Sequence, residues 1–222
     1  AEGQIVQVSP MLEFAITAFV TFFVVIDPIG ILPIFVALTS KKNASARQRI
    51  AMRAVVLAAV TLVAFAFAGD ALFRFLGISL PAFRIAGGLL LLLLSIDMIL
   101  VRPSGLRTAT KAEEEEAEES TDVAVFPLAV PLIAGPGAMT SVILITGRAS
   151  GDFLLQSIAI LALAAVLFLC LLVFVFASRL MQWLGLTGIN VIGRVFGIVL
   201  AGLAIQYIVD GLAASFPILV RH

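Results

Sequence analysis

The sequence has little charge, one cysteine and one histidine, and each shortage excludes a class of protein. Only 13% of the 222 residues are charged, whereas 62% are hydrophobic and the mean hydropathy is +1.18. A soluble domain of this length cannot bury so much apolar surface and still keep a wettable exterior. We therefore predict a membrane protein whose apolar exterior faces the lipid bilayer.

The few reactive side chains limit the chemistry that is available inside a membrane. The only histidine, His222, is the last residue, and the only cysteine, Cys170, lies in an apolar run, where a thiol acts as a small hydrophobic group. The hydrophobic stretches hold no Ser/His, His/Glu or Cys/His set, and the chain has no Gly-Lys-Ser/Thr nucleotide loop. We therefore expect that the protein is neither an enzyme nor an ATP-driven pump and that it has no metal site or cofactor. The net charge of zero argues against a nucleic-acid partner.

Six hydrophobic stretches are long enough to cross a bilayer, which takes about 20 apolar residues each. These stretches are Leu12–Leu38, Ile50–Ala68, Arg84–Val101, Val123–Ile145, Phe153–Phe176 and Ile189–Val209. The third and fourth are separated by residues 102–122, which carry an acidic run from Glu113 to Glu119. We predict a solvated loop here, and a regulatory or partner-binding segment is the alternative.

Lysine and arginine are unevenly divided between the two sets of loops. Ten lie in the first, third and fifth loops, and four lie on the opposite side. Cytoplasmic loops carry the excess of positive charge in membrane proteins. We therefore predict a multi-pass protein of the cell inner membrane with both termini outside. A homo-oligomer is possible, but no pattern in the sequence assigns its symmetry.

The two halves of the chain resemble each other. The segment Phe75–Ser79 (FLGIS) recurs as Trp183–Thr187 (WLGLT) at an offset of 108 residues, and the same offset places Pro28 on Pro136. A self-similar sequence indicates that one structural unit occurs twice.

This similarity predicts two repeats of three helices, residues 12–101 and residues 123–209, joined by the acidic cytoplasmic loop 102–122. Because each copy has an odd number of spans, the second copy enters the membrane upside down. Inverted repeats of this kind are typical of secondary transporters. The predicted fold is therefore an all-α membrane protein with six transmembrane helices in two inverted three-helix repeats.

Proline and glycine interrupt the first and fourth spans at matching points. Asp27–Gly30 reads Asp-Pro-Ile-Gly, and Gly135–Ala138 reads Gly-Pro-Gly-Ala. Proline forces the preceding residue out of the helical region and suits the first position of a new helix. Each of these spans is therefore predicted to be two half-helices with a break between them. A simple kink that helps packing is the alternative.

The breaks carry complementary charge. In inverted repeats, the two half-helix N-termini point inward from opposite sides, and such termini offer free N–H donors to a carboxylate. Asp27 supplies a negative cap at one break, while Gly135 leaves the other uncapped. We predict a zwitterionic amino acid as ligand, with its ammonium near Asp27 and its carboxylate near Gly135–Ala138. Asp27 is also interpretable as a purely structural cap.

The candidate substrate-binding residues are therefore Asp27, Pro28, Gly30, Gly135, Pro136, Gly137, Ala138 and Thr140. Asp27 and Asp97 are the candidates for coupling to an ion, because ionisable residues inside spans are functional by default.

Other residues in the spans suggest structural roles. Arg84 and Arg194 are expected to snorkel to the interface, and Trp183 and Tyr207 suit an interfacial aromatic belt. A group of glycines is expected to let helices pack closely. These glycines are Gly87, Gly88, Gly197 and Gly202.

The break motifs resemble those of a known family. Phe22–Gly30 with Leu32–Phe35 is similar to the first-span motif of the MarC family of integral membrane proteins, and Val130–Ala138 is similar to its fourth-span motif. The resemblance covers nearly the whole chain. Ile31 departs from the family pattern, in which a polar residue, commonly Asn, occupies this position.

The resemblance implies a transport function. The family takes its name from a multiple-antibiotic-resistance locus, and some relatives are described as transporters of glycine, alanine, serine and threonine. A secondary transporter of small neutral amino acids, coupled to H⁺ or Na⁺, is therefore our leading interpretation. The alternatives are a channel or facilitator, a drug or metabolite exporter, and a non-transporting membrane partner that acts through the acidic loop.

Overall fold

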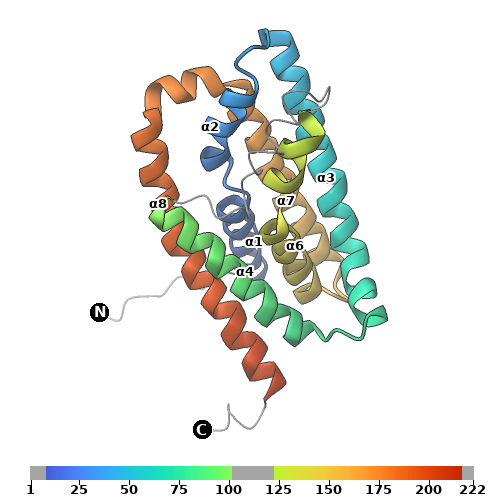
Figure 1. Ribbon diagram of the computed structural model, residues 1–222. Coiled ribbons are helices and arrows are strands. Elements are labelled where there is room, and N and C mark those ends of the chain that lie inside the picture. The colour runs from blue at the N-terminus through green and yellow to red at the C-terminus, as the bar shows by residue number, and fades with distance from the viewer. Residues whose placement is uncertain (1–8, 102–122, 217–222) are drawn as a thin grey trace, which may run out of the picture.

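The computed structural model describes residues 9–101 and 123–216, and within these ranges the chain forms helices and no strands (Figure 1). The helical segments follow one another as α1 (Pro10–Ile26), α2 (Pro28–Leu38), α3 (Ala44–Phe75), α4 (Leu80–Leu100), η1 (Ala124–Ile133), α6 (Pro136–Arg148), α7 (Phe153–Val175) and α8 (Ala177–Ser215). The predicted all-α fold is confirmed. The acidic segment 102–122 and its predicted role lie outside the described residues.

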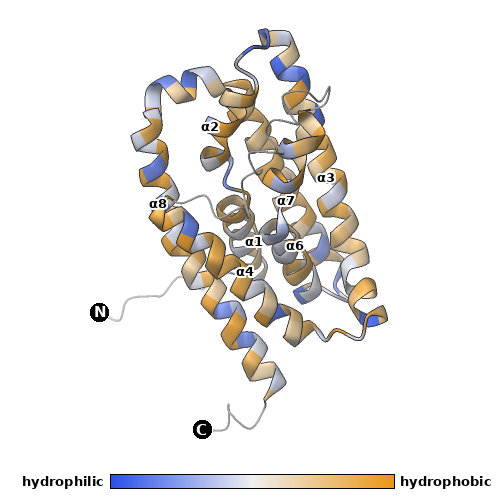
Figure 2. Cartoon of the chain, viewed as in Figure 1, coloured by the Kyte–Doolittle hydropathy of each residue, from blue (hydrophilic) through white to orange (hydrophobic). Residues whose placement is uncertain are grey.

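The helices are long and apolar enough to span a membrane. Five candidate spans pass by length and hydropathy, with α1 and α2 counted together, and η1 with α6 makes a sixth when this pair, bent by 55°, is taken as one span. Large apolar side chains such as Val60, Leu161 and Ile198 are more than 60% exposed on the outside. Hydrophobic residues predominate along most of the helices (Figure 2). The chain is therefore an integral membrane protein.

Some helices extend beyond the predicted spans because capping residues lie outside the apolar stretches. The Asn43 side chain accepts the Ala46 N–H at 2.8 Å, so α3 begins six residues before Ile50. The Ser79 side chain accepts the Ala82 N–H at 3.3 Å and starts α4 ahead of Arg84. Hydropathy identifies the apolar part of a span, whereas the capping residue determines where the helix begins.

The glycines of the matched turns FLGIS and WLGLT share a positive φ. Gly77 has φ of 70° and Gly185 has φ of 60°, a left-handed region that glycine enters at little cost. The first turn joins α3 to α4, and the second bends α8 away from its short first part (Figure 1).

The helix contacts of the two halves correspond to each other. Helix α1 packs on α7 while η1 packs on α3, and α2 packs on α8 while α6 packs on α4. Helices α1 and α6 lie in one half of the bundle, and α2 and η1 lie in the other (Figure 1). These main contacts are therefore preserved when the first half of the chain is exchanged for the second, whereas the contact of α1 with α8 has no comparable counterpart between η1 and α4.

Helices α4 and α8 form a close antiparallel pair. A Cβ atom on Gly88 would lie 2.7 Å from the Ala204 carbonyl oxygen, and one on Gly197 would lie 3.1 Å from the Ser95 carbonyl oxygen. Later residues of α4 thus meet earlier residues of α8. Glycine at these positions lets the two backbones approach.

The predicted packing role of the glycines is confirmed at three of four positions. Gly88 and Gly197 lie at the α4–α8 contact, and Gly87 faces Thr140 of α6. The prediction was wrong for Gly202, where a Cβ atom would meet nothing within 4 Å. Gly202 lies on the exposed side of α8.

The interior is filled by apolar side chains from all parts of the bundle. Phe35 of α2 and Phe174 of α7, both fully buried, stack with ring centroids 4.3 Å apart. Cys170 is also fully buried. It serves as a small hydrophobic core residue, as predicted.

Gly88 and Gly202 allow a direct test of the α4–α8 contact. We expect Gly88→Ala to lower the free energy of unfolding in detergent by about 1–3 kcal/mol, because the added methyl group meets the backbone of α8. Gly202→Ala is the matched control and should be neutral or stabilising by up to about 1 kcal/mol, since alanine favours the helix. Equal effects of the two changes would contradict the close contact.

Candidate substrate site at two helix breaks

Asp27 forms the first break by ending α1 and starting α2. Its backbone N–H donates to the Phe23 carbonyl at 2.9 Å, and its carboxylate accepts the Gly30 N–H at 3.0 Å. Its φ of 48° is left-handed, which asparagine and aspartate tolerate better than most residues. Asp27 is 1% exposed. The predicted N-cap at this break is confirmed.

Gly30 leaves space for the capping carboxylate. A Cβ atom at Gly30 would collide with the carboxylate of Asp27. The Asp27–Gly30 pair therefore behaves as a unit, in which the carboxylate lies over the first turn of α2. Pro28 occupies the first helical position, where a missing N–H costs nothing.

The second break separates η1 from α6 and has no side-chain cap. Gly135 is extended, with φ of −81° and ψ of 173°, and Pro136 begins α6. A Cβ atom at Gly135 would collide with the Pro131 carbonyl oxygen. The uncapped N-terminus predicted for this half-helix is confirmed, and the close backbone approach explains the glycine.

The segment before the second break differs from the predicted regular half-helix. Helix η1 is an irregular π-helix, which is wider than an α-helix. Its backbone angles depart from helical values at Phe126 and Val130. Each of these residues precedes a proline, Pro127 or Pro131, and proline disfavours the helical region for its predecessor. The prediction considered only the break at Gly135 and missed the effect of these two prolines.

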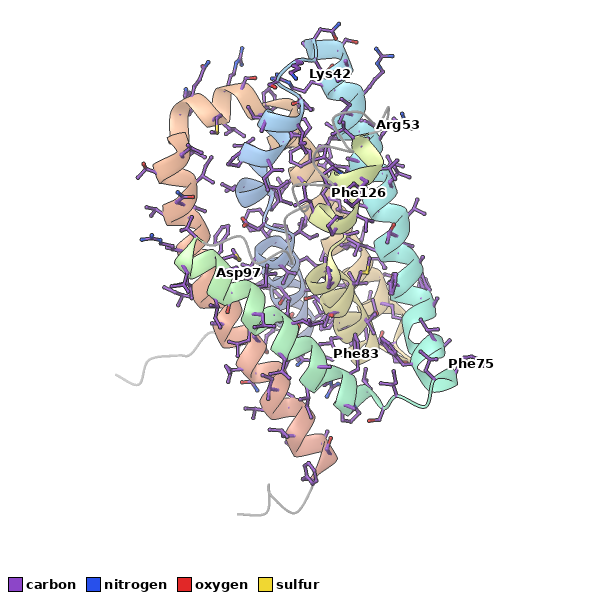
Figure 3. All side chains as sticks on the ribbon, viewed as in Figure 1. Lys42, Arg53, Phe75, Phe83, Asp97 and Phe126 are labelled. Carbon is purple, nitrogen blue, oxygen red and sulfur yellow. The ribbon has the colours of Figure 1, made fainter. Side chains whose placement is uncertain are left out.

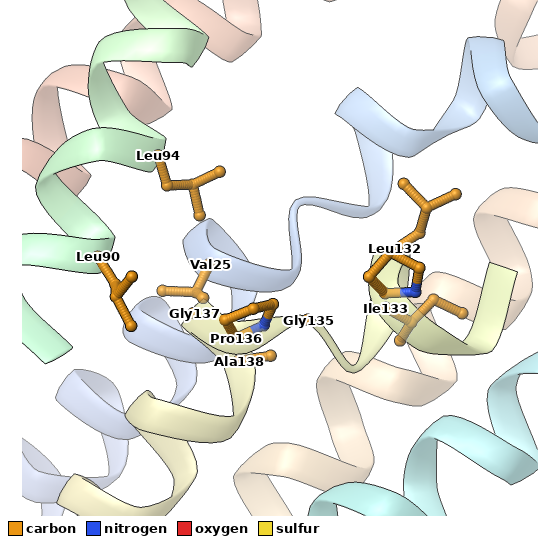
Figure 4. Close-up of a pocket in the computed structure, with 10 residues that line it drawn as sticks. Val25, Leu90, Leu94, Leu132, Ile133, Gly135, Pro136, Gly137 and Ala138 are labelled. Carbon is orange, nitrogen blue, oxygen red and sulfur yellow. The ribbon is translucent and has the colours of Figure 1, made fainter. Parts of the chain in front are cut away.

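A small cavity lies against the second break, where α1, α4 and α6 meet (Figure 4). Its volume of about 20 Å³ is close to the space that one water molecule requires. Four predicted site residues line it, namely Gly135, Pro136, Gly137 and Ala138, together with Val25, Leu90, Leu94, Pro131, Leu132 and Ile133.

The other predicted site residues lie outside this cavity lining. Asp27, Pro28 and Gly30 belong to the first break, which follows Val25 by two residues. Thr140 is buried against Gly87, where a Cβ atom would collide with its methyl group. Asp97 is half-buried in the last turn of α4 (Figure 3). The structure therefore brings the two breaks together but does not join Asp97 to the cavity.

Sequence reasoning missed the apolar wall of the cavity. Leu90 and Leu94 are four residues apart on α4, so they lie on one helix face. They sit in an unbroken run of six leucines, Leu89–Leu94, and a run without alternation does not reveal which face turns inward.

Nearly all of the described helical bundle matches the profile of a known protein family. The profile for the MarC family integral membrane protein matches residues 12–216. The chain belongs to the MarC family. The resemblance noted on the two break motifs is thereby confirmed.

Relatives of this MarC-family chain occur in archaea and bacteria. It is 38% identical to UPF0056 membrane protein MJ1677 of Methanocaldococcus jannaschii, over 92% of this chain and 98% of the relative. It is 34% identical to UPF0056 membrane protein YvbG of Bacillus subtilis (94% and 99%) and 37% identical to UPF0056 membrane protein YhcE of Escherichia coli (90% and 92%). No solved structure matches the chain.

A polar cluster fastens α6 to α8 at one end of this MarC-family bundle. Arg148 donates from Nη2 to Asp210 Oδ2 at 2.7 Å, and Gln206 donates to Asp210 Oδ1, also at 2.7 Å. The Arg148 guanidinium lies 5.3 Å from the centroid of the Tyr207 ring. Because Tyr207 is only 3% exposed, its predicted place in an interfacial belt was wrong, whereas Trp183 is 88% exposed and fits one.

A second arginine fastens the opposite end of the bundle. Arg47, at the start of α3, donates from Nη1 to Ser178 Oγ at 2.6 Å and from Nη2 to the Thr39 carbonyl at 3.3 Å. These bonds tie the end of α2 to the first turn of α8. Both half-helices that start at the breaks, α2 and α6, are thus held to α8 at their far ends.

Asp27 can be tested as a cap independently of any transport. We expect Asp27→Ala to lower the free energy of unfolding by about 2–3 kcal/mol, because the cap is lost and alanine disfavours a left-handed backbone. Asp27→Asn should change it by less than about 1 kcal/mol, since the amide oxygen can accept the same N–H bond. Denaturant titration in detergent measures both. An equal loss in the two variants would mean that the charge, rather than the cap, holds the break.

Proposed function

We propose that this MarC-family protein is a secondary transporter of small neutral amino acids of the glycine, alanine, serine and threonine class. The observation that carries the proposal is the pair of adjacent helix breaks, one with the buried carboxylate of Asp27 and one with the uncapped N-terminus at Gly135. The ammonium group of the substrate binds near Asp27, and its carboxylate binds the free N–H groups at Gly137 and Ala138.

The small size of the break residues supports a small substrate. A Cβ atom at Gly137 would already lie 3.1–3.3 Å from Leu91, Leu94 and Val25, so little space is available for a substrate side chain. A site built from backbone N–H groups and one carboxylate recognises the amino-acid backbone rather than a particular side chain.

The proposed architecture is two inverted repeats, residues 12–101 and 123–209. The corresponding helix contacts and the shared left-handed glycines at Gly77 and Gly185 support this arrangement. In this arrangement the acidic loop 102–122 is cytoplasmic, both termini are outside, and the protein resides in the cell inner membrane, as the distribution of lysine and arginine indicates.

Transport in this proposal proceeds by alternating access. The cavity at the second break holds about one water molecule, so the substrate enters only when one repeat moves against the other. The bonds of Arg47 and Arg148 lie at opposite ends of the bundle and can open in turn. If substrate movement is coupled to H⁺ or Na⁺, Asp27 is the first candidate for the residue that binds the ion, and Asp97 is the second.

We expect purified wild-type protein in proteoliposomes to show saturable uptake and counterflow of labelled glycine, alanine or threonine. Gly137→Ala should lower the uptake about tenfold or more, because the methyl group fills the space at the break. Asp27→Asn should lower it at least as much, since removing a charged partner costs about 1.5–3 kcal/mol of binding.

Gly147→Ala is the control on the same helix, because its added Cβ atom would lie 3.6 Å from Leu80, an ordinary contact distance. This variant should transport like the wild type. Flux without saturation or counterflow would favour a channel instead. No flux of any small amino acid under a proton or a sodium gradient would refute the substrate assignment, and drug or metabolite export or a partner role would then be tested, the last by deleting residues 113–119.

A further inference from the structure

Arg84 is a cation without an ion-pair partner in the part of the chain that the structure describes. It lies one turn into α4 and is only partly exposed, and its Nε atom is buried without a hydrogen-bond partner. Its Cβ atom lies 3.2 Å from the position of an added Cβ at Gly211 of α8, so its stem is wedged between the two helices.

Buried hydroxyl groups lie near this cation. Tyr207 is 3% exposed and lies one helical turn before Gly211, the residue of α8 that meets the stem of Arg84. Thr21 of α1 lies beside Tyr207 and is completely buried, yet its Oγ1 atom has no hydrogen-bond partner of good geometry. A buried hydroxyl without a partner is costly unless a ligand or water satisfies it.

The local charge is unbalanced. Asp210 is the acid of this cluster, and both of its oxygens are engaged, Oδ2 by Arg148 and Oδ1 by Gln206. Among the described residues of this cluster, two arginines and one carboxylate therefore leave one positive charge. That charge belongs to Arg84, because Arg148 already has its partner.

We propose that Arg84, with the hydroxyl groups of Thr21 and Tyr207, binds a small oxyanion. A guanidinium group matches a carboxylate or phosphate through two parallel N–H bonds, and the hydroxyls supply further donors. The oxyanion is a carboxylate from solution or the phosphate of a lipid head group. This site is separate from the helix breaks, since Arg84 precedes the cavity residue Leu90 by about 9 Å along α4.

Binding is measured on purified full-length protein in an uncharged detergent, so the result does not depend on transport. One arm uses equilibrium dialysis with labelled acetate, and the other uses native mass spectrometry with short-chain phosphatidylglycerol against phosphatidylcholine. We expect saturable binding of at least one oxyanion to the wild type. Arg84→Gln should weaken it about tenfold or more, and Arg84→Lys should weaken it less, because lysine keeps the charge but lacks the planar fork.

Arg194→Gln is the matched control, because Arg194 is an arginine of α8, the helix that packs on α4, and is exposed. It should bind like the wild type. Without oxyanion, Arg84→Gln should unfold at the same temperature as the wild type or higher, since it removes an unsatisfied buried group. Thr21→Val, which leaves every charge in place, should also weaken binding.

Absence of saturable binding of both probes to the wild type would overturn the proposal, as would wild-type affinity in Arg84→Gln. A lower unfolding temperature of oxyanion-free Arg84→Gln, together with unchanged binding in Thr21→Val, would assign Arg84 a structural role instead.

Discussion

The structure depends on the requirement that backbone N–H and C=O groups inside a bilayer find partners within the protein. Unbroken helices meet this requirement by themselves, and α3, α4 and α7 do so. The breaks at Asp27 and Gly135 do not, and the surrounding residues compensate. The Asp27 carboxylate takes up one free N–H group. Gly135 lets the chain pass close to the Pro131 carbonyl, and Asp27 and Gly135 are themselves buried among the other helices.

The two breaks differ in how the N-terminus of the following half-helix is capped, and this difference sets the chemistry of the candidate site. One half-helix start is satisfied by an acidic side chain, whereas the other has no side-chain cap and borders a cavity. A purely structural pair of kinks would gain stability from a cap on both. Leaving one N-terminus open maintains a positive dipole end beside the cavity, where a carboxylate would interact with it favourably.

Helix α8 connects this site to both ends of the bundle. It packs closely along α4. Its Ser178 accepts a bond from Arg47 of α3, which also bonds the Thr39 carbonyl at the end of α2, and its Asp210 pairs with Arg148 at the end of α6. Exposed ion pairs and hydrogen bonds contribute little free energy. The bonds of Arg47 and Arg148 therefore stabilise this conformation only weakly. The contact between α4 and α8, in contrast, depends at Gly88 and Gly197 on the close approach of the two helix backbones.

The sequence by itself determined the membrane class, the helical spans and the position of both breaks, because hydropathy, proline and glycine act over a few neighbouring residues. It predicted the cap at Asp27 and the open N-terminus at Gly135 for the same reason. It did not reveal the irregular η1, the leucines that face the cavity, or the cluster around Tyr207. Only the tertiary structure decided these, since identical leucines and scattered polar residues acquire roles through the helices packed against them.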